Sequence, residues 1–509
     1  MYSSVSTAMV VGSAGHAITV EVQVASGLPG FHIVGRPNGV VREARDRLRG
    51  AFYSSDEPWP KTNTTLNLVP ATEIKTGSAL DLAMAVGILI ADGHVDPAAV
   101  RGLAFIGELG LDGSIRHVLG VAPMVAALGP VDVVVPSGSH REAQIAAQGE
   151  VRTADDLPQL LAVLRGLRPW PDPPPPPPTQ LHDDLRDLQD VHGQHVARHG
   201  LEIAAAGGHH LLFVGPPGAG KTMLAARLPG LLPPLTDDRS LEATMIHSAA
   251  GMPLPAGGLV TQPPYRAPHH TASRAALIGG GSPSLWPGEV SLAHGGVLFL
   301  DELAEFTPSV LDGLRQPLEL GTISIDRAAV RATMPSAFQL VAAMNPCPCG
   351  GGPPGTCMCS DGERLRYARR VSGPLLDRFD LRVPVARPGA HDLLDGTPGE
   401  STASVAARVR RARALSIERQ GTLNAVLGAR RLDEHAQVDE AAKTLLYDEI
   451  SAGRLSGRGY HRLRRVARTI ADLRSVHSDE PVGIVVADDV ALALAMRTPL
   501  GTSSSGWAV

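Results

Sequence analysis

The spacing of apolar residues in the first third of the chain predicts strands and helices in alternation. The stretches AITVEVQVA and VDVVVPSG alternate in polarity or run β-branched, which is typical of strands. NGVVREARDRLRGAFYSS and SALDLAMAVGILIADG place apolar residues at helical spacing. Together these patterns predict a compact α/β domain over residues 1–167.

The middle of the chain, residues 183–388, has the pattern of a parallel nucleotide-binding sheet. HHLLFVGPPGAGKTMLAARL indicates an apolar strand, a glycine-rich loop and the start of a helix. GGVLFLDEL and FQLVAAMN contain short apolar runs of the kind that parallel sheets bury on both faces. We therefore predict a doubly wound P-loop core.

The last third of the chain carries helical patterns without strand signals, so residues 389–499 are expected to form a helical lid domain. Residues 500–509, LGTSSSGWAV, are expected to form a loose tail. The amphipathic stretches of the lid are SVAARVRRARALSIERQ, DEAAKTLLYDEIS, GYHRLRRVARTIADLRS and ADDVALALAMR.

A proline-rich stretch separates the first domain from the core. Residues 168–182 include six consecutive prolines, which favour a stiff polyproline II spacer. A proline-rich ligand for another protein is the alternative interpretation.

Composition limits the possible partners and location. The net charge of −5, from 46 basic and 51 acidic residues, predicts neither a nucleic-acid coat nor a membrane binder, so a polyanion would have to bind at a local patch. The chain lacks a secretory signal pattern and any apolar run of about 18 residues, so we expect a soluble, cytoplasmic protein without membrane contact. Lysine is rare and occurs only at Lys61, Lys75, Lys221 and Lys443.

One of these lysines lies in a phosphate-binding motif. GPPGAGKT matches G-x-x-x-x-G-K-[ST] directly after a predicted strand and at the start of a predicted helix, the context that supports ATP binding. In such loops backbone N–H groups bind phosphate oxygens, the lysine contacts the β- and γ-phosphates, and the hydroxyl is a ligand of Mg²⁺. The predicted ATP ligands are Gly215, Pro216, Pro217, Gly218, Ala219, Gly220, Lys221 and Thr222.

Polar residues follow the next two predicted strands of the core. Asp301 and Glu302 end one strand, where Asp301 can hold Mg²⁺ and Glu302 can orient the attacking water. Asn345 ends the other strand, where its amide can align that water or sense the γ-phosphate. An ordinary strand-end asparagine that caps the turn before Pro346 is the alternative for Asn345.

A long set of motifs occurs in order along the chain: GPPGAGKT, PHHTAS, PGEVSLAHGGVLFLDELAEF, LRQPLE, FQLVAAMNPCPCG, SGPLLDRFDL and LSGRGYHRLRRVARTIADL. Together these motifs resemble the magnesium-chelatase-like AAA+ ATPases of the ComM (YifB) type. The resemblance implies a ring, expected to be a hexamer, with ATP at the subunit interfaces and with helicase or branch-migration activity on DNA during recombination or DNA uptake.

The resemblance assigns further residues to the ATP site. Arg378 of LLDRFD would be an arginine finger for the neighbouring subunit, and Arg458 of LSGRGYHRL would be the second sensor over the nucleotide. A salt bridge of Arg378 with Asp377 or Asp380, and a solvated helix face for Arg458, are the alternatives. Val191 and Gln194 occupy the positions where the family lines its adenine pocket.

Two core insertions resemble the helix-2 insert, about residues 262–291, and the pre-sensor hairpin, about residues 319–333, of this clade. The resemblance places both at the central pore, where Asp326, Arg327 and Arg331 could lie beside nucleic-acid phosphates. Ordinary surface charges on a hairpin are the alternative.

The first domain resembles a Lon-protease-like fold, related to domain 2 of ribosomal protein S5. Ser78 occupies the position of the nucleophile, but Met124 occupies the position of the required lysine base. A thioether cannot accept the proton, and Lys75 lies too close to Ser78 in sequence to match the pair. We therefore expect no proteolysis, and a role for this domain in organising the ring or binding DNA.

All four cysteines lie within thirteen residues, in the pattern C-x-C-x7-C-x-C. Cys347, Cys349, Cys357 and Cys359 could hold a structural Zn²⁺ with the Gly/Pro stretch as the turn, and free reduced thiols are the alternative.

Two function classes stay open on the sequence. The first is the ring-forming ATPase that moves on DNA. The second is a chelatase-type motor that remodels a partner protein for metal insertion, against which the Lon-like domain and the absence of an integrin-like metal-binding module in this sequence both argue.

Overall fold

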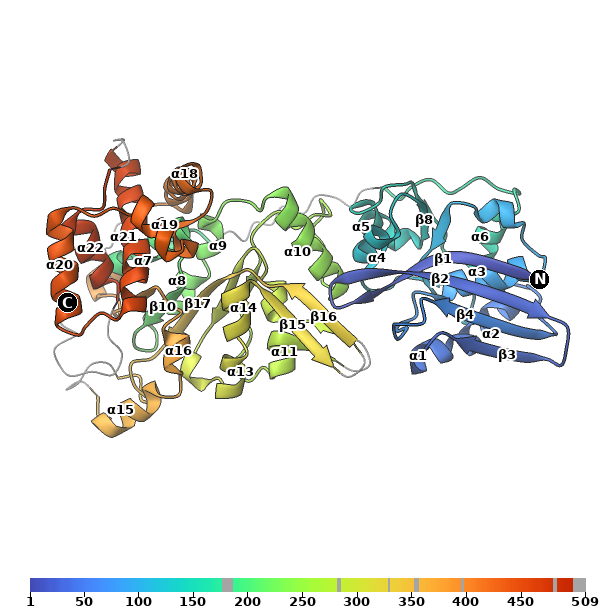
Figure 1. The fold of residues 1–509 in the computed structure, drawn as a ribbon, viewed down its shortest axis with the longest axis horizontal. Helices are drawn as coiled ribbons and strands as arrows, with labels where there is room; N and C mark the ends of the chain where they lie inside the picture. The colour runs from blue at the N-terminus through green and yellow to red at the C-terminus, as the bar shows by residue number, and fades with distance from the viewer. Residues whose placement is uncertain are drawn as a thin grey trace.

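The structure, a computed structural model, describes residues 1–175, 186–281, 285–327, 330–351, 357–394, 398–478 and 483–497. An α/β domain lies at one end, the parallel-sheet core lies in the middle, and a helical domain lies at the other end (Figure 1). The three regions follow one another along the chain, as the sequence predicts. In these ranges no helix combines the length and the apolar character that crossing a membrane requires.

The first domain is a seven-stranded mixed sheet in the order β3-β4-β2-β1-β5-β8-β9. Alternate residues of β1 face two separate apolar clusters, so helices cover both faces of the sheet. The strands are β1 (Tyr2–Val11), β2 (Ala14–Ala25), β3 (Gly30–Val34), β4 (Asn63–Val69), β5 (Leu103–Phe105), β8 (Asp132–Val135) and β9 (Val151–Thr153), with a separate hairpin of β6 (Glu108–Leu109) and β7 (Ile115–Arg116).

Both helical patterns expected in this domain are present, but they differ in burial. The first forms two short helices with exposed polar faces, whereas every residue of α3 is buried between the sheet and its neighbours. The helices are α1 (Gly39–Arg42), α2 (Ala44–Ser54), α3 (Asp81–Ala91), α4 (Val121–Leu128), α5 (His140–Gln144) and α6 (Leu157–Leu164), with 3₁₀ turns η1 (Pro97–Val100) and η2 (Ser137–Ser139).

The core sheet has five parallel strands in the order β11-β14-β17-β10-β18. Every residue of β10, β14 and β17 is buried, which confirms the prediction of central strands covered on both faces. The strands are β10 (Leu211–Val214), β11 (Tyr265–Arg266), β14 (Val297–Leu300), β17 (Gln339–Met344) and β18 (Leu381–Pro384).

Short helices flank this sheet and carry its connections. They are α7 (His195–Gly207), α8 (Lys221–Ala225), α9 (Leu228–Leu231), α10 (Asp237–Ala249), α11 (Arg274–Ile278), α12 (Glu289–Leu292), α13 (Pro308–Asp312), α14 (Arg315–Leu320), α15 (Asp361–Ala368) and α16 (Gly373–Leu376), with η3 (Leu188–Asp190) and η4 (Leu303–Glu305).

Both insertions expected in the core are present, with shifted limits. The first insertion holds α11 and the small pair β12 (Gly279–Gly280) and β13 (Trp286–Pro287), but Tyr265 and Arg266 belong to core strand β11. The second insertion is the hairpin of β15 (Thr322–Arg327) and β16 (Val330–Pro335). It starts later than expected, because residues 319 and 320 are the end of α14.

The helical domain contains the four predicted helices and two shorter helices that the pattern did not indicate. Its bounds are α17 (Ala390–Leu394), α18 (Thr402–Gln420), α19 (Ala429–His435), α20 (Glu440–Ser451), α21 (Gly457–Ser478) and α22 (Ala487–Ala495), with η5 (Asn424–Val426). The predicted tail, residues 500–509, lies outside the described residues.

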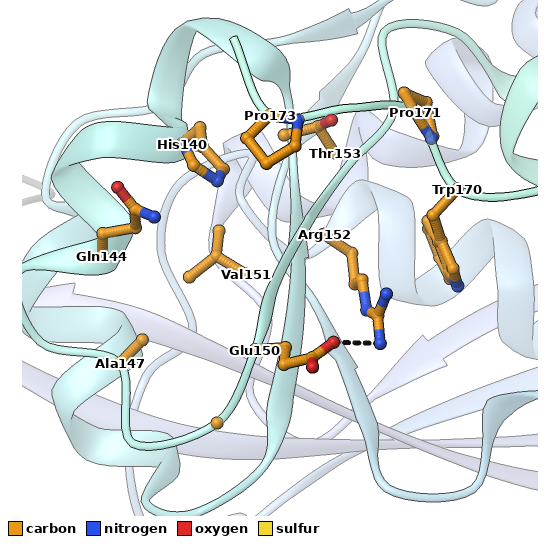
Figure 2. A pocket seen from close by; sticks show the side chains of 11 residues that line it. His140, Gln144, Ala147, Glu150, Val151, Arg152, Thr153, Trp170, Pro171 and Pro173 are labelled. Carbon is orange, nitrogen blue, oxygen red and sulfur yellow. Dashed lines mark ion pairs between the residues drawn. The ribbon is translucent and has the colours of Figure 1, made fainter. Parts of the chain in front are cut away.

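The start of the proline-rich stretch lies against the first domain. The Arg152 guanidinium stands 5.7 Å from the centre of the Trp170 ring. Together they border an open cavity of about 540 Å³, in which Arg152 also pairs with Glu150 (Figure 2). The start of the stretch thus borders the first domain, whereas residues 176–182, with half of the consecutive prolines of the predicted linker 168–182, lie outside the described part, so the spacer stays a prediction.

The first domain contacts the core through α4 and α5 and through the turn between β1 and β2. The Gly120 amide donates to the Ser248 carbonyl at 3.1 Å, and the Ser248 hydroxyl donates to Glu142, so α4 and α5 border α10. The turn between β1 and β2 meets the core insertions, because the Gly12 amide donates to the Leu285 carbonyl at 3.2 Å. Figure 1 shows the β15–β16 hairpin extending toward this turn.

Candidate nucleotide site

The glycine-rich loop connects β10 to α8 as the motif predicts. Gly218 and Gly220 have φ angles of +76° and +89°, which side chains with a Cβ rarely adopt. A Cβ on either residue would meet no atom within 4 Å, so the space before the loop is open. Gly215 instead allows close packing of two backbone segments, because a Cβ there would lie 2.1 Å from the Val385 carbonyl oxygen.

Lys221 lies across this loop and connects it to the neighbouring strand. Its Nζ donates to the carbonyl oxygens of Gly215 at 2.7 Å and Pro216 at 2.9 Å, and to Asn345 Oδ1 at 3.1 Å. Burial lowers the pKa of Lys221. The structure therefore brings the strand-end amide of Asn345 to the phosphate-loop lysine.

Thr222 and Asp301 meet at the same edge of the sheet. The Thr222 hydroxyl donates to Asp301 Oδ2 at 2.7 Å, because α8 begins beside the end of β14. A hydroxyl and a carboxylate oxygen are hard oxygen donors, which fit Mg²⁺. The structure thus brings together the two residues that the sequence predicts as magnesium ligands.

Glu302 lies next to this pair in a strained backbone conformation. Its φ angle is +52°, in the left-handed region, and its carboxylate is directed to His270, with 3.1 Å between Nδ1 and Oε2. Sequence reasoning gave His270 no role, although PHHTAS was among the family motifs. Only the packing of the chain shows that the second histidine reaches the carboxylate.

The two residues assigned to the adenine side lie beside the phosphate loop. The Gln194 side-chain amide donates to the Ala219 carbonyl at 3.1 Å and to the Ala386 carbonyl. Val191 is buried in the core under this turn. Gln194 therefore joins the segment before α7 to the loop that carries the phosphate-binding amides.

Arg378 forms an ion pair with Glu319 at the end of α14. The two partners named as alternatives are engaged elsewhere, because Asp377 lies 3.9 Å from Arg382 and Asp380 lies 3.2 Å from His209. The alternative given for Arg378, a salt bridge with Asp377 or Asp380, is therefore wrong in its partners.

Arg378 and Arg458 belong to one group of arginines. Arg458 is exposed in the first turn of α21. Burial and the nearby charges of Arg462, Arg458 and Arg315 lower the pKa of Arg378. In the described part of the chain, neither Arg378 nor Arg458 is hydrogen-bonded or ion-paired to the phosphate loop. Within the described residues, these two arginines therefore do not complete the phosphate site of their own chain.

The four cysteines gather their thiols in one compact cluster. Their sulfur atoms all lie within 4.8 Å of one another, and Cys347 Sγ is 3.5 Å from Cys349 Sγ and 3.7 Å from Cys357 Sγ. Arg364 donates to Cys357 Sγ at 2.8 Å, and the Gly351 amide lowers the pKa of Cys349 to about 7. Residues 352–356, most of the expected Gly/Pro turn, lie outside the described residues.

In the described part of the first domain, no hydrogen bond joins Ser78 to a lysine. The Ser78 hydroxyl donates to Glu108, and Met124 is fully buried in α4. Lys75 is buried and donates to the carbonyl oxygens of Pro70 and Glu73, and burial lowers its pKa. In the described residues Lys75 and Ser78 thus have different hydrogen-bond partners, and the absence of proteolysis stays a prediction.

The charged residues of the β15–β16 hairpin are partly neutralised by one another. Asp326 and Arg331 are opposite residues in the strand register, and their side chains form an exposed ion pair with 2.7 Å between Oδ1 and Nε. The side chain of Arg327 lies outside the described residues.

The parallel sheet, the glycine loop, the Thr–Asp pair and the helical lid define a P-loop ATPase of the AAA+ type. Three family models match the chain: "Magnesium chelatase, subunit ChlI" over residues 187–410, "Subunit ChlI of Mg-chelatase" over residues 20–138, and "Magnesium chelatase, subunit ChlI C-terminal" over residues 399–497. The matches extend over all three regions of the fold.

Relatives of similar length identify the family more closely. An uncharacterized protein of Mycobacterium tuberculosis is 44% identical over 96% of each chain, and the YifB protein of Escherichia coli is 41% identical over 92% of this chain and 93% of its own. The competence protein ComM of Haemophilus influenzae is 40% identical over 90% of this chain and 91% of its own. The chain belongs to the magnesium-chelatase-like ComM family.

A shorter match extends to a larger protein. The probable DNA helicase MCM9 of Oryza sativa subsp. indica is 30% identical over 191 residues, which are 37% of this chain and 23% of that protein.

Proposed function

We propose that this protein is an ATP-driven motor that acts on DNA as a ring of identical subunits, which we expect to be hexameric. The observation that carries the ATPase part is the contact of three strand ends at one edge of the core sheet. There, Lys221 bonds to Asn345 and Thr222 bonds to Asp301. Membership of an AAA+ family supports ATP hydrolysis as the activity.

The residues of this edge fit ATP and Mg²⁺. The open space before Gly218 and Gly220 leaves their amides accessible to phosphate oxygens, and Lys221 adds a positive charge beside them. Thr222 and Asp301 would hold the magnesium, which when bound neutralises charge on the phosphates. Glu302 would orient the attacking water and accept its proton.

The arginine group supports an arrangement in which neighbouring subunits complete each other's sites. Arg378 lies near Arg462, Arg458 and Arg315 and pairs with Glu319. In the described ranges, neither Arg378 nor Arg458 is bonded to the phosphate loop of its own chain. An arginine supplied by a neighbour stabilises transition-state charge and accelerates phosphoryl transfer by about 10³–10⁵-fold. We propose this role for Arg378, with Arg458 beside it as a second cation at the interface.

DNA is the substrate that the relatives favour. The partial match to a protein named as a probable DNA helicase and the similarity to a competence protein both support a polynucleotide substrate. We propose that the motor unwinds or migrates branched DNA in recombination or DNA uptake, with the β15–β16 hairpin facing the strand in the pore.

A second candidate is a chelatase-type motor that remodels a partner protein for metal insertion. The observation that favours it is the description of the three matching family models as magnesium-chelatase subunits. The two candidates differ in their activator: stimulation of ATPase activity by DNA supports the motor on DNA, whereas stimulation by a partner protein alone supports the chelatase-type motor.

The decisive experiment compares the wild-type protein with the Glu302→Gln variant. The wild type should hydrolyse ATP faster with single-stranded, forked or four-way-junction DNA and should separate the strands of the latter two. Glu302→Gln should bind ATP with the affinity of the wild type while hydrolysis falls by about 10²–10⁴-fold, the usual contribution of a general base. ATPase activity that does not respond to any DNA, with no strand separation, would exclude the proposed function.

We also propose that the thiol cluster holds one structural Zn²⁺. Four cysteine sulfurs within 4.8 Å supply the four thiolates of a closed tetrahedral site. The Arg364 guanidinium and the Gly351 amide next to them would offset part of the negative charge of four thiolates. Zinc would fix the loop that follows Asn345 and so hold that amide in place.

A further inference from the structure

One edge of the sheet in the first domain has no neighbouring strand among the described residues. Strand β9 is the last strand in the sheet order and pairs with β8 on its other side. Directly after β9, the Ala154 amide donates to the Val135 carbonyl of β8 at 3.1 Å. Because successive residues of a strand direct their backbone groups to opposite edges, those of Val151 and Thr153 point away from β8.

This free edge offers a hydrogen-bond acceptor and a donor side by side. On one edge of a strand, the C=O of a residue and the N–H two residues later are adjacent, and here they belong to Val151 and Thr153. In the described part of the chain neither group is hydrogen-bonded. Both residues line the open cavity of about 540 Å³ (Figure 2). A ligand in this cavity therefore meets an acceptor and a donor at the strand edge.

Two buried polar side chains on the cavity wall have no partner among the described residues. His140 of α5 is only 4% exposed, and neither of its ring nitrogens is hydrogen-bonded there. Burial lowers the pKa of His140, so the neutral ring has one donor and one acceptor at pH 7. The Thr153 hydroxyl, on a residue that is also 4% exposed, is not hydrogen-bonded either. Buried polar groups are normally hydrogen-bonded, so these two favour a ligand with polar atoms.

Arg152 and Trp170 form a flat wall on the side of the cavity opposite Gln144 (Figure 2). Among the described residues that line the cavity, Arg152 is the one cation. Glu150 pairs with it and Asp132 lies 3.8 Å from it, so its charge is already neutralised. Indole and guanidinium planes stack on the rings of nucleobases. The wall therefore favours an uncharged flat ring over a phosphate group.

We propose that this cavity binds a nucleobase, stacked on the wall of Arg152 and Trp170. The C=O of Val151 and the N–H of Thr153 bond to the base, because each nucleobase has a donor and an acceptor side by side on its Watson–Crick edge. His140 supplies a further hydrogen bond. The base belongs to an unpaired DNA strand or to a free nucleoside, two sources with the same chemistry. The site lies in the first domain and does not rest on the proposed ATPase, because binding a base requires no ATP.

The test measures, without ATP, the binding of thymidine, an oligothymidylate and an abasic oligonucleotide of the same length to the full chain by equilibrium dialysis. Trp170→Ala should weaken thymidine binding at least about fivefold through lost stacking. The abasic oligonucleotide has phosphates without bases, so Trp170→Ala should leave its binding unchanged.

Two proline variants test the strand edge. Thr153→Pro removes an outward N–H but keeps the ladder to β8, and should weaken thymidine binding about two- to tenfold. Val151→Pro is the matched control, because it removes the other outward N–H, which the base does not use, and should keep the wild-type affinity.

The outcomes assign the source of the base or overturn the site. Tighter binding per base of the oligothymidylate supports an unpaired strand, and equal affinity per base supports a free nucleoside. Wild-type affinity for thymidine in Trp170→Ala overturns the proposal, and so does an equal loss in Val151→Pro and Thr153→Pro. Binding of acetyl-trivaline amide without binding of thymidine also overturns it and assigns the edge to an extended peptide. A wild type that binds thymidine but hydrolyses no ATP overturns the proposed function alone.

Discussion

A single methyl group at Gly350 should weaken ATP binding, because this residue joins the cysteine loop to the phosphate loop. Gly350 has a φ angle of +70° and lies between Cys349 and Gly351. A Cβ at this position would lie 2.6 Å from Cδ and 2.7 Å from Cγ of Pro217. The Gly350→Ala variant therefore tests whether the two loops depend on each other.

Two costs add in this variant. The left-handed conformation costs about 1–2 kcal/mol in a residue with a Cβ. The contact with Pro217 is a second cost, because a proline ring cannot rotate away, and overpacking of this kind costs about 1–3 kcal/mol. The sum, about 2–5 kcal/mol, can be relieved only if one of the two loops moves. If the phosphate loop carries about 1.4 kcal/mol of it, the affinity for ATP falls tenfold.

The assay is the titration of the variant with a fluorescent ATP analogue, together with thermal melting. Gly350→Ala should bind the analogue at least about tenfold more weakly than the wild type. Gly362→Ala is the matched control, because Gly362 is in α15, has no positive φ and would place its Cβ more than 4 Å from any atom. Wild-type affinity and unchanged melting in Gly350→Ala would refute the reasoning that the cysteine loop restrains the phosphate loop.

Two further experiments test the metal site and the subunit interface. Purified wild-type protein should contain about one zinc per chain by elemental analysis, and Cys347→Ser combined with Cys357→Ser should contain none; a zinc-free wild type would contradict the site. Arg378→Ala should lower the ATPase rate by about 10³-fold without a change in melting temperature, whereas Glu319→Ala, which removes the same ion pair, should retain most of the rate. Equal losses in both variants would show that the ion pair, and not the arginine, is required.

The sequence predicts most of the core because its signals there are local. Strands β10 and β14 are apolar throughout, and β17 is apolar after Gln339, a pattern that needs no knowledge of the neighbours. Asp301 follows β14 and Asn345 follows β17. Parallel strands then bring their carboxyl ends to one edge, so the meeting of Lys221, Asp301 and Asn345 follows from topology. Strand β11 escapes prediction because it has only two residues, Tyr265 and Arg266.

Residues whose role depends on a distant partner could not be found in this way. His270 pairs with Glu302, 32 positions away in the chain, and Arg378 pairs with Glu319, 59 positions away. No periodicity or spacing in the sequence indicates either pair. The position of Trp170 against Arg152 is a similar case, because six prolines predict stiffness but not the surface against which the preceding residues pack.

The distribution of charge over the site explains why one chain is not expected to be an efficient ATPase. Lys221 is hydrogen-bonded to Asn345 and Thr222 to Asp301, so the residues proposed to hold the phosphates and the metal meet within a single chain. The cation that would stabilise charge in the transition state is held elsewhere, because Arg378 is paired with Glu319 and surrounded by other arginines. Burial and the nearby charges of Arg462, Arg458 and Arg315 lower the pKa of Arg378, and Glu319 is the anion that pairs with it in this chain. In the proposed ring, the triphosphate bound by a neighbouring subunit would replace Glu319 as the partner of Arg378, which is why the proposed hydrolysis requires assembly.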